Sequence, residues 1–222
     1  MKKKLILSGV FLTLFAILLV LVLKVDVAPI GPNGTEIGLA EINKSVHEFF
    51  GVNDGLYTVT EYLGYACLVV AAGFAFGGLV QMIKRKSLLK VDKKILCLGG
   101  LYVVIGVIYV FFEKVIINYR PVIEKGADAP EASFPSSHTV LACVIMGSAI
   151  ILMKDYVKNK PQRLLLGSLC GFVMGAVVIG RLVCGVHWIT DIIGGILLSI
   201  ALICLFWAIT EKIGEKDVTK DN

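Results

Sequence analysis

The sequence has few charged residues, no closely spaced pair of cysteines and no segment in which polar and apolar residues alternate. Of its 222 residues only 18% are charged and 57% are hydrophobic, whereas a soluble domain is about a quarter charged and about half apolar. The apolar residues form long unbroken blocks, which excludes a disordered chain, a collagen and a coiled coil. The formal net charge of +5 would be a weak sign of nucleic-acid binding in a soluble protein. Here the charges lie between the apolar blocks, so no nucleic-acid partner is expected.

The missing cysteine pair argues against a structural metal site. All the cysteines lie in or beside apolar blocks, and none lies in the long polar connections on the side where an oxidising compartment would allow disulfide bonds. We therefore interpret them as small core residues and expect them to bind no metal. They are Cys67, Cys97, Cys143, Cys170, Cys184 and Cys204.

Six apolar blocks have the length, or nearly the length, of a membrane-spanning helix, which needs about 20 residues to cross the roughly 30 Å hydrocarbon core. Because the alternation of a barrel strand is missing, only helices can satisfy the backbone in lipid. The fold class is therefore predicted to be all-α: a polytopic membrane protein with six transmembrane helices, in a single membrane-embedded domain over residues 1–222. The blocks are Leu5–Leu23, Leu56–Ile83, Ile95–Phe112, Thr139–Met153, Leu164–Gly180 and Ile192–Ile209.

The ends of several blocks carry further information. The first block follows three lysines, as a cleaved signal peptide would, but it is longer than a usual signal core and no clear A-x-A site follows, so a retained helix is expected. The second block holds Glu61 near its start, which places its first one or two turns above the hydrocarbon. The fourth and fifth blocks are short, so their helices should extend into neighbouring polar residues.

The basic residues between the blocks fall mainly on one side of the predicted bundle. Of the 22 lysines and arginines, 16 lie before the first block, after the last one, or in the connections 84–94 and 154–163. Basic residues mark the cytoplasmic side. Both termini are therefore predicted to be cytoplasmic, with segments 24–55, 113–138 and 181–191 outside a cell membrane. Residues 212–222 are predicted to form a polar cytoplasmic tail, disordered from about Lys212.

The outer segment 24–55 begins with turn residues and continues with an apolar stripe at helical spacing. A short amphipathic helix is predicted there. It either lies on the outer leaflet or packs as a cap on the bundle, and the pattern does not separate the two alternatives. The stripe consists of Leu39, Ile42, Val46, Phe49 and Phe50.

Two polar stretches on the predicted outer side, 113–138 and 180–191, need partners or a function, because a charge at the bilayer centre costs about 2.5–3.5 kcal/mol on insertion scales. His187 and Asp191 are four residues apart and share one helical face. There the carboxylate can accept the Nδ1–H of the imidazole and leave Nε2 with its lone pair.

The predicted topology brings polar residues from separate spans to one outer face. Arginine side chains bind phosphate oxygens bidentately, and the N-terminus of a helix donates further N–H groups to an anion. One histidine can attack phosphorus while a second protonates the leaving oxygen. The residues of this set are Arg120, Ser136, His138, Arg181, His187 and Asp191.

At these positions the sequence resembles the type-2 phosphatidic acid phosphatase family, also called lipid phosphate phosphatases, in its bacterial membrane-bound branch. The family motifs are K-x6-R-P, P-S-G-H and S-R-x5-H-x3-D. Here the third reads G-R-x5-H-x3-D over 180–191, the second reads P-S-S-H over 135–138, and the first keeps only Arg120-Pro121. The resemblance covers roughly residues 56–210, and three motifs in order on the predicted side are specific.

The resemblance implies a hydrolase that uses no metal or other cofactor. His187 would be the nucleophile that forms a phosphohistidine, Asp191 would orient it, and His138 would be the general acid. The phosphate-binding residues would be Arg120, Arg181, Ser136, Ser137 and Lys114.

Three departures from the motifs bear on activity. Glu113 stands at the lysine position and would repel a phosphate, while Lys114 is displaced by about 100° around a helix. Lys125, in the following loop, is an alternative lysine. Ser137 keeps the backbone N–H of the motif glycine, so little loss is expected. Gly180 lacks the hydroxyl of the motif serine.

The predicted function is hydrolysis of a lipid phosphate or pyrophosphate at the outer leaflet, with the lipid substrate and the bilayer as partners. In a bacterium the candidate substrates are undecaprenyl pyrophosphate, phosphatidylglycerol phosphate and phosphatidic acid, and family analogy favours the first, which is left on that face after wall-polymer synthesis. The alternatives are a lipid phosphotransferase and a non-catalytic membrane homologue. Soluble vanadium haloperoxidases share the histidine and arginine pattern, but six spans argue against that chemistry.

Overall fold

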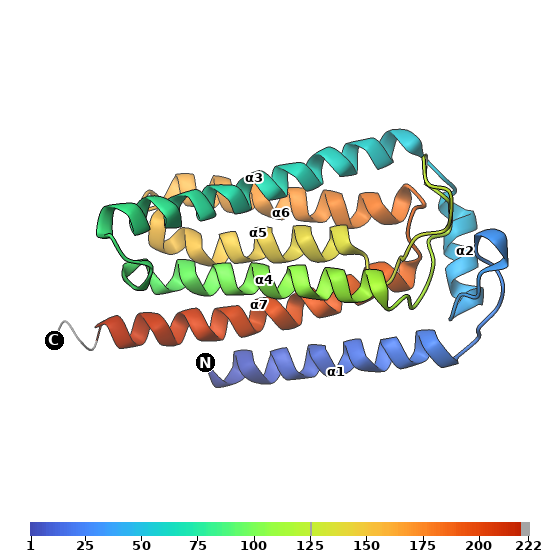
Figure 1. Cartoon of the computed structure of the whole chain (residues 1–222), viewed down its shortest axis with the longest axis horizontal. Helices are drawn as coiled ribbons and strands as arrows, with labels where there is room; N and C mark the ends of the chain where they lie inside the picture. The colour runs from blue at the N-terminus through green and yellow to red at the C-terminus, as the bar shows by residue number, and fades with distance from the viewer. Residues whose placement is uncertain (125, 219–222) are drawn as a thin grey trace.

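The apolar blocks form the long helices of a bundle whose axes run roughly side by side (Figure 1). The computed structural model describes residues 1–124 and 126–218. Among these, six helices are long and apolar enough to cross a membrane, and the all-α, six-helix prediction is confirmed. They are α1 (Lys2–Lys24), α3 (Asp54–Arg85), α4 (Lys93–Lys114), α5 (Ser137–Tyr156), α6 (Lys160–Val183) and α7 (Ile189–Val218). The shorter elements are α2 (Ala40–Phe50) and two single 3₁₀ turns, Pro32–Gly34 and Leu88–Lys90.

Polar residues begin α5 two residues, and α6 four residues, before their apolar blocks. The side chain of Ser136 accepts a hydrogen bond from the backbone N–H of Thr139, so α5 starts earlier than its apolar run. Asn159 does the same for α6 by accepting from the N–H of Gln162 at 3.0 Å. The short fourth and fifth blocks therefore become helices of 20 and 24 residues, as their length required.

The last helix continues past its apolar block. Glu211 forms ion pairs of 2.6 Å with both Lys4 and the N-terminal ammonium group, which anchors α7 to α1 beyond the hydrophobic run. The helix then extends to Val218. The prediction of disorder from Lys212 is therefore wrong for residues 212–218, where lysine and glutamate favour helix continuation; residues 219–222 lie outside the described part.

The first helix is an integral member of the bundle. It packs along α7, where the hydroxyl of Ser8 donates to the carbonyl of Ala201 at 2.8 Å. The buried ring of Phe15 stacks on Phe134 with centroids 5.8 Å apart and meets Phe112 edge-on at 6.2 Å. Helix α1 thereby supports the chain segment that leads into α5.

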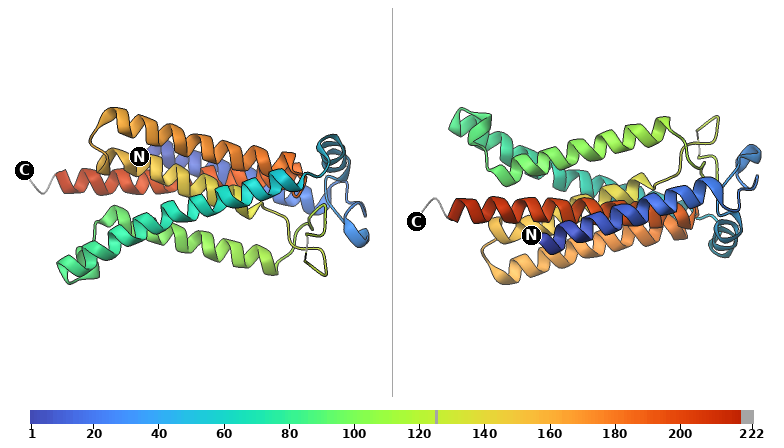
Figure 2. Two further views of the ribbon diagram at one scale, coloured as in Figure 1. Left: turned by 90° about the horizontal axis from the view of Figure 1, so that it is seen from above. Right: turned by 90° about the horizontal axis from the view of Figure 1, so that it is seen from below.

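The two termini lie at one end of the bundle, and α2 crosses the opposite end, which we call the distal end (Figure 1). Helix α5 lies centrally, in contact with α3, α4, α6 and α7. Helices α3 and α4 meet near their connection and diverge toward the distal end (Figure 2). The outward location of the distal end is a matter of membrane orientation and stays a prediction.

Helix α2 caps the distal end through a polar contact and directs apolar side chains outward. Asn43 is buried: its amide donates to the hydroxyl of Thr190 at 3.0 Å, and its oxygen accepts from the N–H of Thr190 at 3.3 Å. Ile42 and Phe49 of the apolar stripe are exposed, Phe49 by 81%. Both alternatives for this helix therefore have a physical basis: one face packs on the bundle, and another offers apolar side chains to an interface.

Candidate active site

Backbone and indole hydrogen bonds join the three motif segments at the distal end. The N–H of Ser136, at the start of α5, donates to the carbonyl of Asp191 in α7 at 3.0 Å. The indole N–H of Trp188 donates to the carbonyl of Tyr119, next to Arg120, at 2.7 Å. Segments far apart in sequence are thereby fixed in register with one another.

The segment between α4 and α5 folds back on itself. The N–H of Arg120 donates to the carbonyl of Glu131, and the N–H of Ser133 donates to the carbonyl of Asn118, both at 2.9 Å. This short antiparallel pairing places Arg120 and Ser133 on adjacent stretches of chain. The side chains of both are buried.

The loop between α6 and α7 depends on a glycine. Gly185 has a φ of +73°, and a Cβ at this position would lie 2.0 Å from the carbonyl oxygen of Gly51. The N–H of Asn53 donates to the carbonyl of Cys184 at 3.1 Å. The junction of α2 and α3 therefore holds the loop that presents His187.

Ser133 bridges His187 and Asp191. The Nδ1 of His187 lies 3.1 Å from the Ser133 hydroxyl and 3.5 Å from Oδ2 of Asp191, and the same hydroxyl donates to that Oδ2 in a short hydrogen bond. The N–H of Trp188 also donates to Oδ2, at 2.9 Å. Since the hydroxyl donates to the carboxylate, it accepts from Nδ1–H, which leaves Nε2 of His187 as the unprotonated nitrogen.

His187 is electrostatically suited to remain neutral. Burial lowers its pKa well below the usual value, and the positive charges of Arg120 and Arg181 lower it further, as does His138. Its Nε2 is buried and has no hydrogen-bond partner among the described residues. A neutral imidazole with a free lone pair is the form that a nucleophile requires.

Glu61 of α3 connects Arg181 and His138. The guanidinium of Arg181 is completely buried, lies 5.0 Å from the ring centroid of Tyr57, and forms a short ion pair with Oε1 of Glu61. The same oxygen lies 3.1 Å from Nε2 of His138. Within the described chain, Nε and Nη1 of Arg181 are buried and donate to no hydrogen-bond partner. These two groups are donors of the kind that bind an anion.

Arg120 also carries carboxylate neighbours. Its Nη1 lies 2.5 Å from Glu124, and its Nε lies 3.5 Å from Glu131. Glu124 in turn accepts a hydrogen bond of 2.9 Å from the hydroxyl of Tyr57. Both arginines of the motifs are therefore charge-compensated by glutamates.

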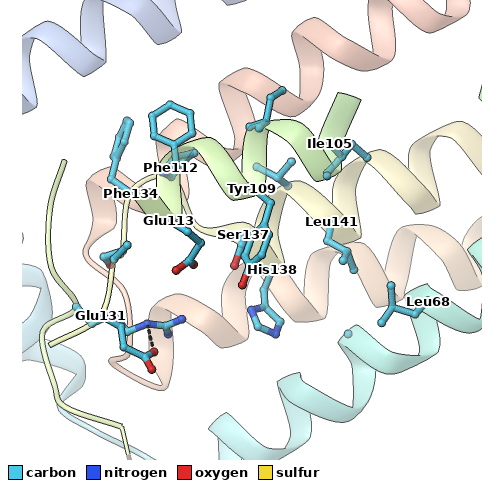
Figure 3. A pocket seen from close by; sticks show the side chains of 18 of the residues that line it. Leu68, Ile105, Tyr109, Phe112, Glu113, Glu131, Phe134, Ser137, His138 and Leu141 are labelled. Carbon is cyan, nitrogen blue, oxygen red and sulfur yellow. Dashed lines mark ion pairs between the residues drawn. The ribbon is translucent and has the colours of Figure 1, made fainter. Parts of the chain in front are cut away.

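A cavity of about 700 Å³ opens between α3, α4, α5 and the segment 115–136. Figure 3 shows His138 and Ser137 at its polar end, together with Glu113 and Glu131. Most of the remaining lining is apolar and comes from the helices, with Leu68, Ile105, Phe112 and Leu141 among the residues that Figure 3 labels. A polar pocket continuous with an apolar groove suits an amphipathic molecule.

The structure separates the sequence-predicted phosphate ligands. Ser137 lines the cavity, whereas the Ser136 hydroxyl caps α5. Lys114 is exposed at the end of α4 and is not one of the described residues that line the cavity, while Glu113 is. Lys125 lies outside the described residues.

Steric contact explains why glycine rather than serine occupies the first position of the third motif. A Cβ at Gly180 would lie 2.4 Å from Cγ2 of Thr60, a buried residue of α3. The β-branched threonine has little freedom to move away. The close approach of α3 and α6 at this point, one residue from Glu61 and one from Arg181, therefore depends on the glycine.

Sequence reasoning missed two residues of this site. Ser133 precedes the second motif and matches no motif position, and in the sequence Glu61 indicates only that α3 emerges from the hydrocarbon. The signal in the sequence that Glu61 belongs to the site is its charge, which lies between one and two helical turns inside an apolar block. In the described ranges no three His, Cys, Asp or Glu side chains group as metal ligands do.

Comparison with known proteins places this architecture in a family. A solved structure of a transmembrane PAP2-type phosphatidylglycerolphosphate phosphatase from Bacillus subtilis has the same fold, with a TM-score of 0.66 and 19% identity over 93% of this chain and 96% of that one. The curated phosphatidylglycerophosphatase B of Bacillus subtilis (strain 168) is 30% identical over 104 residues, which is 46% of this chain and 49% of the relative. The matched region is thus about half of that relative's length. The family model of the PAP2 superfamily matches residues 66–215, and the chain belongs to this superfamily.

Proposed function

We propose that the protein is a membrane lipid phosphatase that cleaves a phosphate monoester or pyrophosphate at the outer leaflet through a phosphohistidine. The observation that carries the proposal is the buried Nε2 of His187, whose lone pair is set free by the bond from Nδ1 to Ser133. Membership of the PAP2 superfamily supports it independently.

The reaction is proposed to run in two steps. In the first, the lone pair on Nε2 of His187 forms a bond to phosphorus, the bond from phosphorus to the lipid oxygen breaks, and His138 gives that oxygen a proton. In the second, water attacks phosphorus, the N–P bond breaks, and His138 takes the proton from water. Arg120 and Arg181 stabilise the charge on the phosphoryl oxygens throughout.

The guanidiniums provide the positive charge that a metal ion supplies in many other phosphatases, so we propose a metal-independent reaction. Ser137, at the rim of the cavity, and the N-terminus of α5 add hydrogen-bond donors. Lys114 has no such support from its exposed position, and its role as a phosphate ligand is not retained in the proposal.

The proposal for the substrate rests on the apolar lining of the cavity and on the names of the similar proteins. The apolar groove has room for part of an acyl or prenyl chain beside the polar end. Family analogy favours undecaprenyl pyrophosphate, but both similar Bacillus subtilis proteins are named for phosphatidylglycerophosphate. We therefore propose phosphatidylglycerol phosphate as the first substrate to test and undecaprenyl pyrophosphate as the second.

Phosphate release by the purified protein tests the proposal. We expect release from at least one of phosphatidylglycerol phosphate, undecaprenyl pyrophosphate and phosphatidic acid, unaffected by EDTA, and at least 10³-fold lower in His187→Ala, in line with about 10⁴-fold or larger losses of other catalytic nucleophiles. The conservative variant Ser45→Ala on the exposed face of α2 serves as the control. No release from any lipid, or equal release by His187→Ala, would contradict the enzyme proposal. Release that requires an added acceptor would show a phosphotransferase, and loss of activity with EDTA would refute metal independence.

A further inference from the structure

Glu61 lies where the proposed function requires a phosphate. Its Oε1 contacts the guanidinium of Arg181 and Nε2 of His138, so one oxygen is shared by two of the proposed phosphate-contacting groups. No motif position corresponds to this glutamate, which comes from α3 rather than from any of the three motif segments. Figure 3 shows the ring of His138 directed toward the space between α3 and the polar end of the cavity.

The burial of Arg181 explains why an anion is needed there. Its side chain is fully inaccessible, and a buried guanidinium without a counter-ion is strongly destabilising. In the resting protein Glu61 is that counter-ion. A phosphate dianion that binds to the same N–H donors cannot share them with a carboxylate, because two acceptors would compete for each proton and the two negative charges would repel.

The surroundings give Glu61 a place to move to. About a quarter of its side chain is exposed, and it lines the 700 Å³ cavity. Meanwhile the Nε and Nη1 groups of Arg181, which are buried and have no hydrogen-bond partner among the residues described, are donors that an anion can use once the carboxylate has moved. Gly64, one turn further along α3, has no side chain, so the ring of His138 can approach within 3.2 Å of where a Cβ would lie.

From this geometry we infer that Glu61 is the resting occupant of the phosphate-binding position, and that phosphate binding exchanges one anion for another. The inference rests on the proposed function and adds a specificity-determining residue to it. Because the carboxylate returns when the product leaves, it weakens the hold on inorganic phosphate and favours product release. The apparent affinity for phosphate is reduced by the fraction of protein in which the carboxylate has not moved away.

Binding of inorganic phosphate to purified Glu61→Gln tests the inference without turnover. We expect about tenfold tighter binding than in the wild type, as for a site that is free about a tenth of the time, measured by the phosphate-dependent shift in Tm. Glu113→Gln is the matched control, because Glu113 lines the same cavity from α4. This variant removes the same charge but leaves Glu61 in its position between Arg181 and His138. We expect its affinity for phosphate to rise by less than threefold.

A second variant keeps the test decisive if Glu61→Gln does not fold. In Glu61→Ala, added acetate should fill the vacated position and compete with phosphate, whereas acetate should not affect phosphate binding by the wild type. Equal phosphate affinity in the wild type and the Glu61 variants, or an equal gain in Glu113→Gln, would overturn the inference and leave the proposed function standing. Failure of inorganic phosphate to bind either the wild type or the Glu61 variants would overturn the inference, and phosphate release from the lipid panel then decides the proposed function separately.

Discussion

The chemistry proposed for the distal end depends on the protonation of single atoms, above all on which nitrogen of His187 carries the proton. The family motif pairs this histidine directly with Asp191, but here their closest atoms are 3.5 Å apart and the Ser133 hydroxyl lies between them. The hydroxyl passes the orienting effect of the carboxylate to the imidazole. A serine outside the motifs therefore helps to position the proposed nucleophile.

Replacing Ser133 with alanine should lower kcat by about 10- to 100-fold, since a hydrogen bond to a charged group contributes about 1.5–3 kcal/mol. KM should change little because the hydroxyl holds the nucleophile rather than the substrate. Initial-rate measurements with one lipid phosphate check this, and Ser133→Thr should restore part of the rate. An unchanged kcat in Ser133→Ala would mean that Asp191 orients His187 without the serine.

The pH dependence of kcat/KM should reflect the environment of His187. Burial and the two arginines lower its pKa, and the reactive form is the neutral one. The loss of activity that protonation of His187 causes on the acid side is therefore expected only below pH 6.5, the ordinary histidine value. A pH–rate profile of the wild type checks this. An acid limb at or above pH 6.5 would contradict the electrostatic account of the site.

At the scale of helices and loops, the spans and the motif order are predictable because they depend on local pattern. Long apolar runs determine the helices, and the spacing of Arg181, His187 and Asp191 is fixed within one stretch of chain. The ends of the helices are predicted less accurately than the helices themselves. N-cap residues such as Ser136 and the ion pairs of Glu211 extend the helices into polar sequence.

The unpredicted features depend on how one helix is rotated against another. The contact of Glu61 with Arg181 joins α3 to α6, and no periodicity within either helix specifies it. The same holds for Glu113 and Lys114: their one-residue offset decides which of them faces the cavity, and the backbone of α4 places the glutamate there. Contacts between segments distant in sequence thus set the finer composition of the site.

The approach of α3 to α6 gives a prediction for Gly180→Ser, which restores the motif serine. Its Cβ would collide with Thr60, so the variant should lose about 1–3 kcal/mol of stability, as overpacked sites do. Thr60→Ala should recover most of this loss in the double variant. Thermal unfolding of the four proteins in detergent checks the pair, and additive effects of the two substitutions would show that the two positions do not interact.

For the molecule as a whole, the bundle separates two ends with different properties. The termini and the α3–α4 and α5–α6 connections lie at one end, and the site lies at the other, under α2 (Figure 1). The strongly basic connections are those at the end with the termini. The positive-inside tendency then predicts that the site faces out of the cell.

Labelling of single cysteines tests this orientation. Glu48 on α2 and Lys158 between α5 and α6 are both exposed, at opposite ends of the bundle, and the native cysteines are all buried or half-buried. In intact cells a membrane-impermeant maleimide should label Glu48→Cys and spare Lys158→Cys, and permeabilised cells should label both. The reverse pattern in intact cells would place the site on the cytoplasmic side.

The most direct test of the account is to trap the covalent intermediate at His187. Purified protein mixed with a lipid phosphate and quenched under alkaline conditions should yield a peptide phosphorylated on His187 by mass spectrometry, absent from His187→Ala and formed more slowly by His138→Ala. If lipid dephosphorylation proceeds while rapid-quench samples carry no phosphate on His187, or carry it on another residue, the proposed role of this histidine is contradicted.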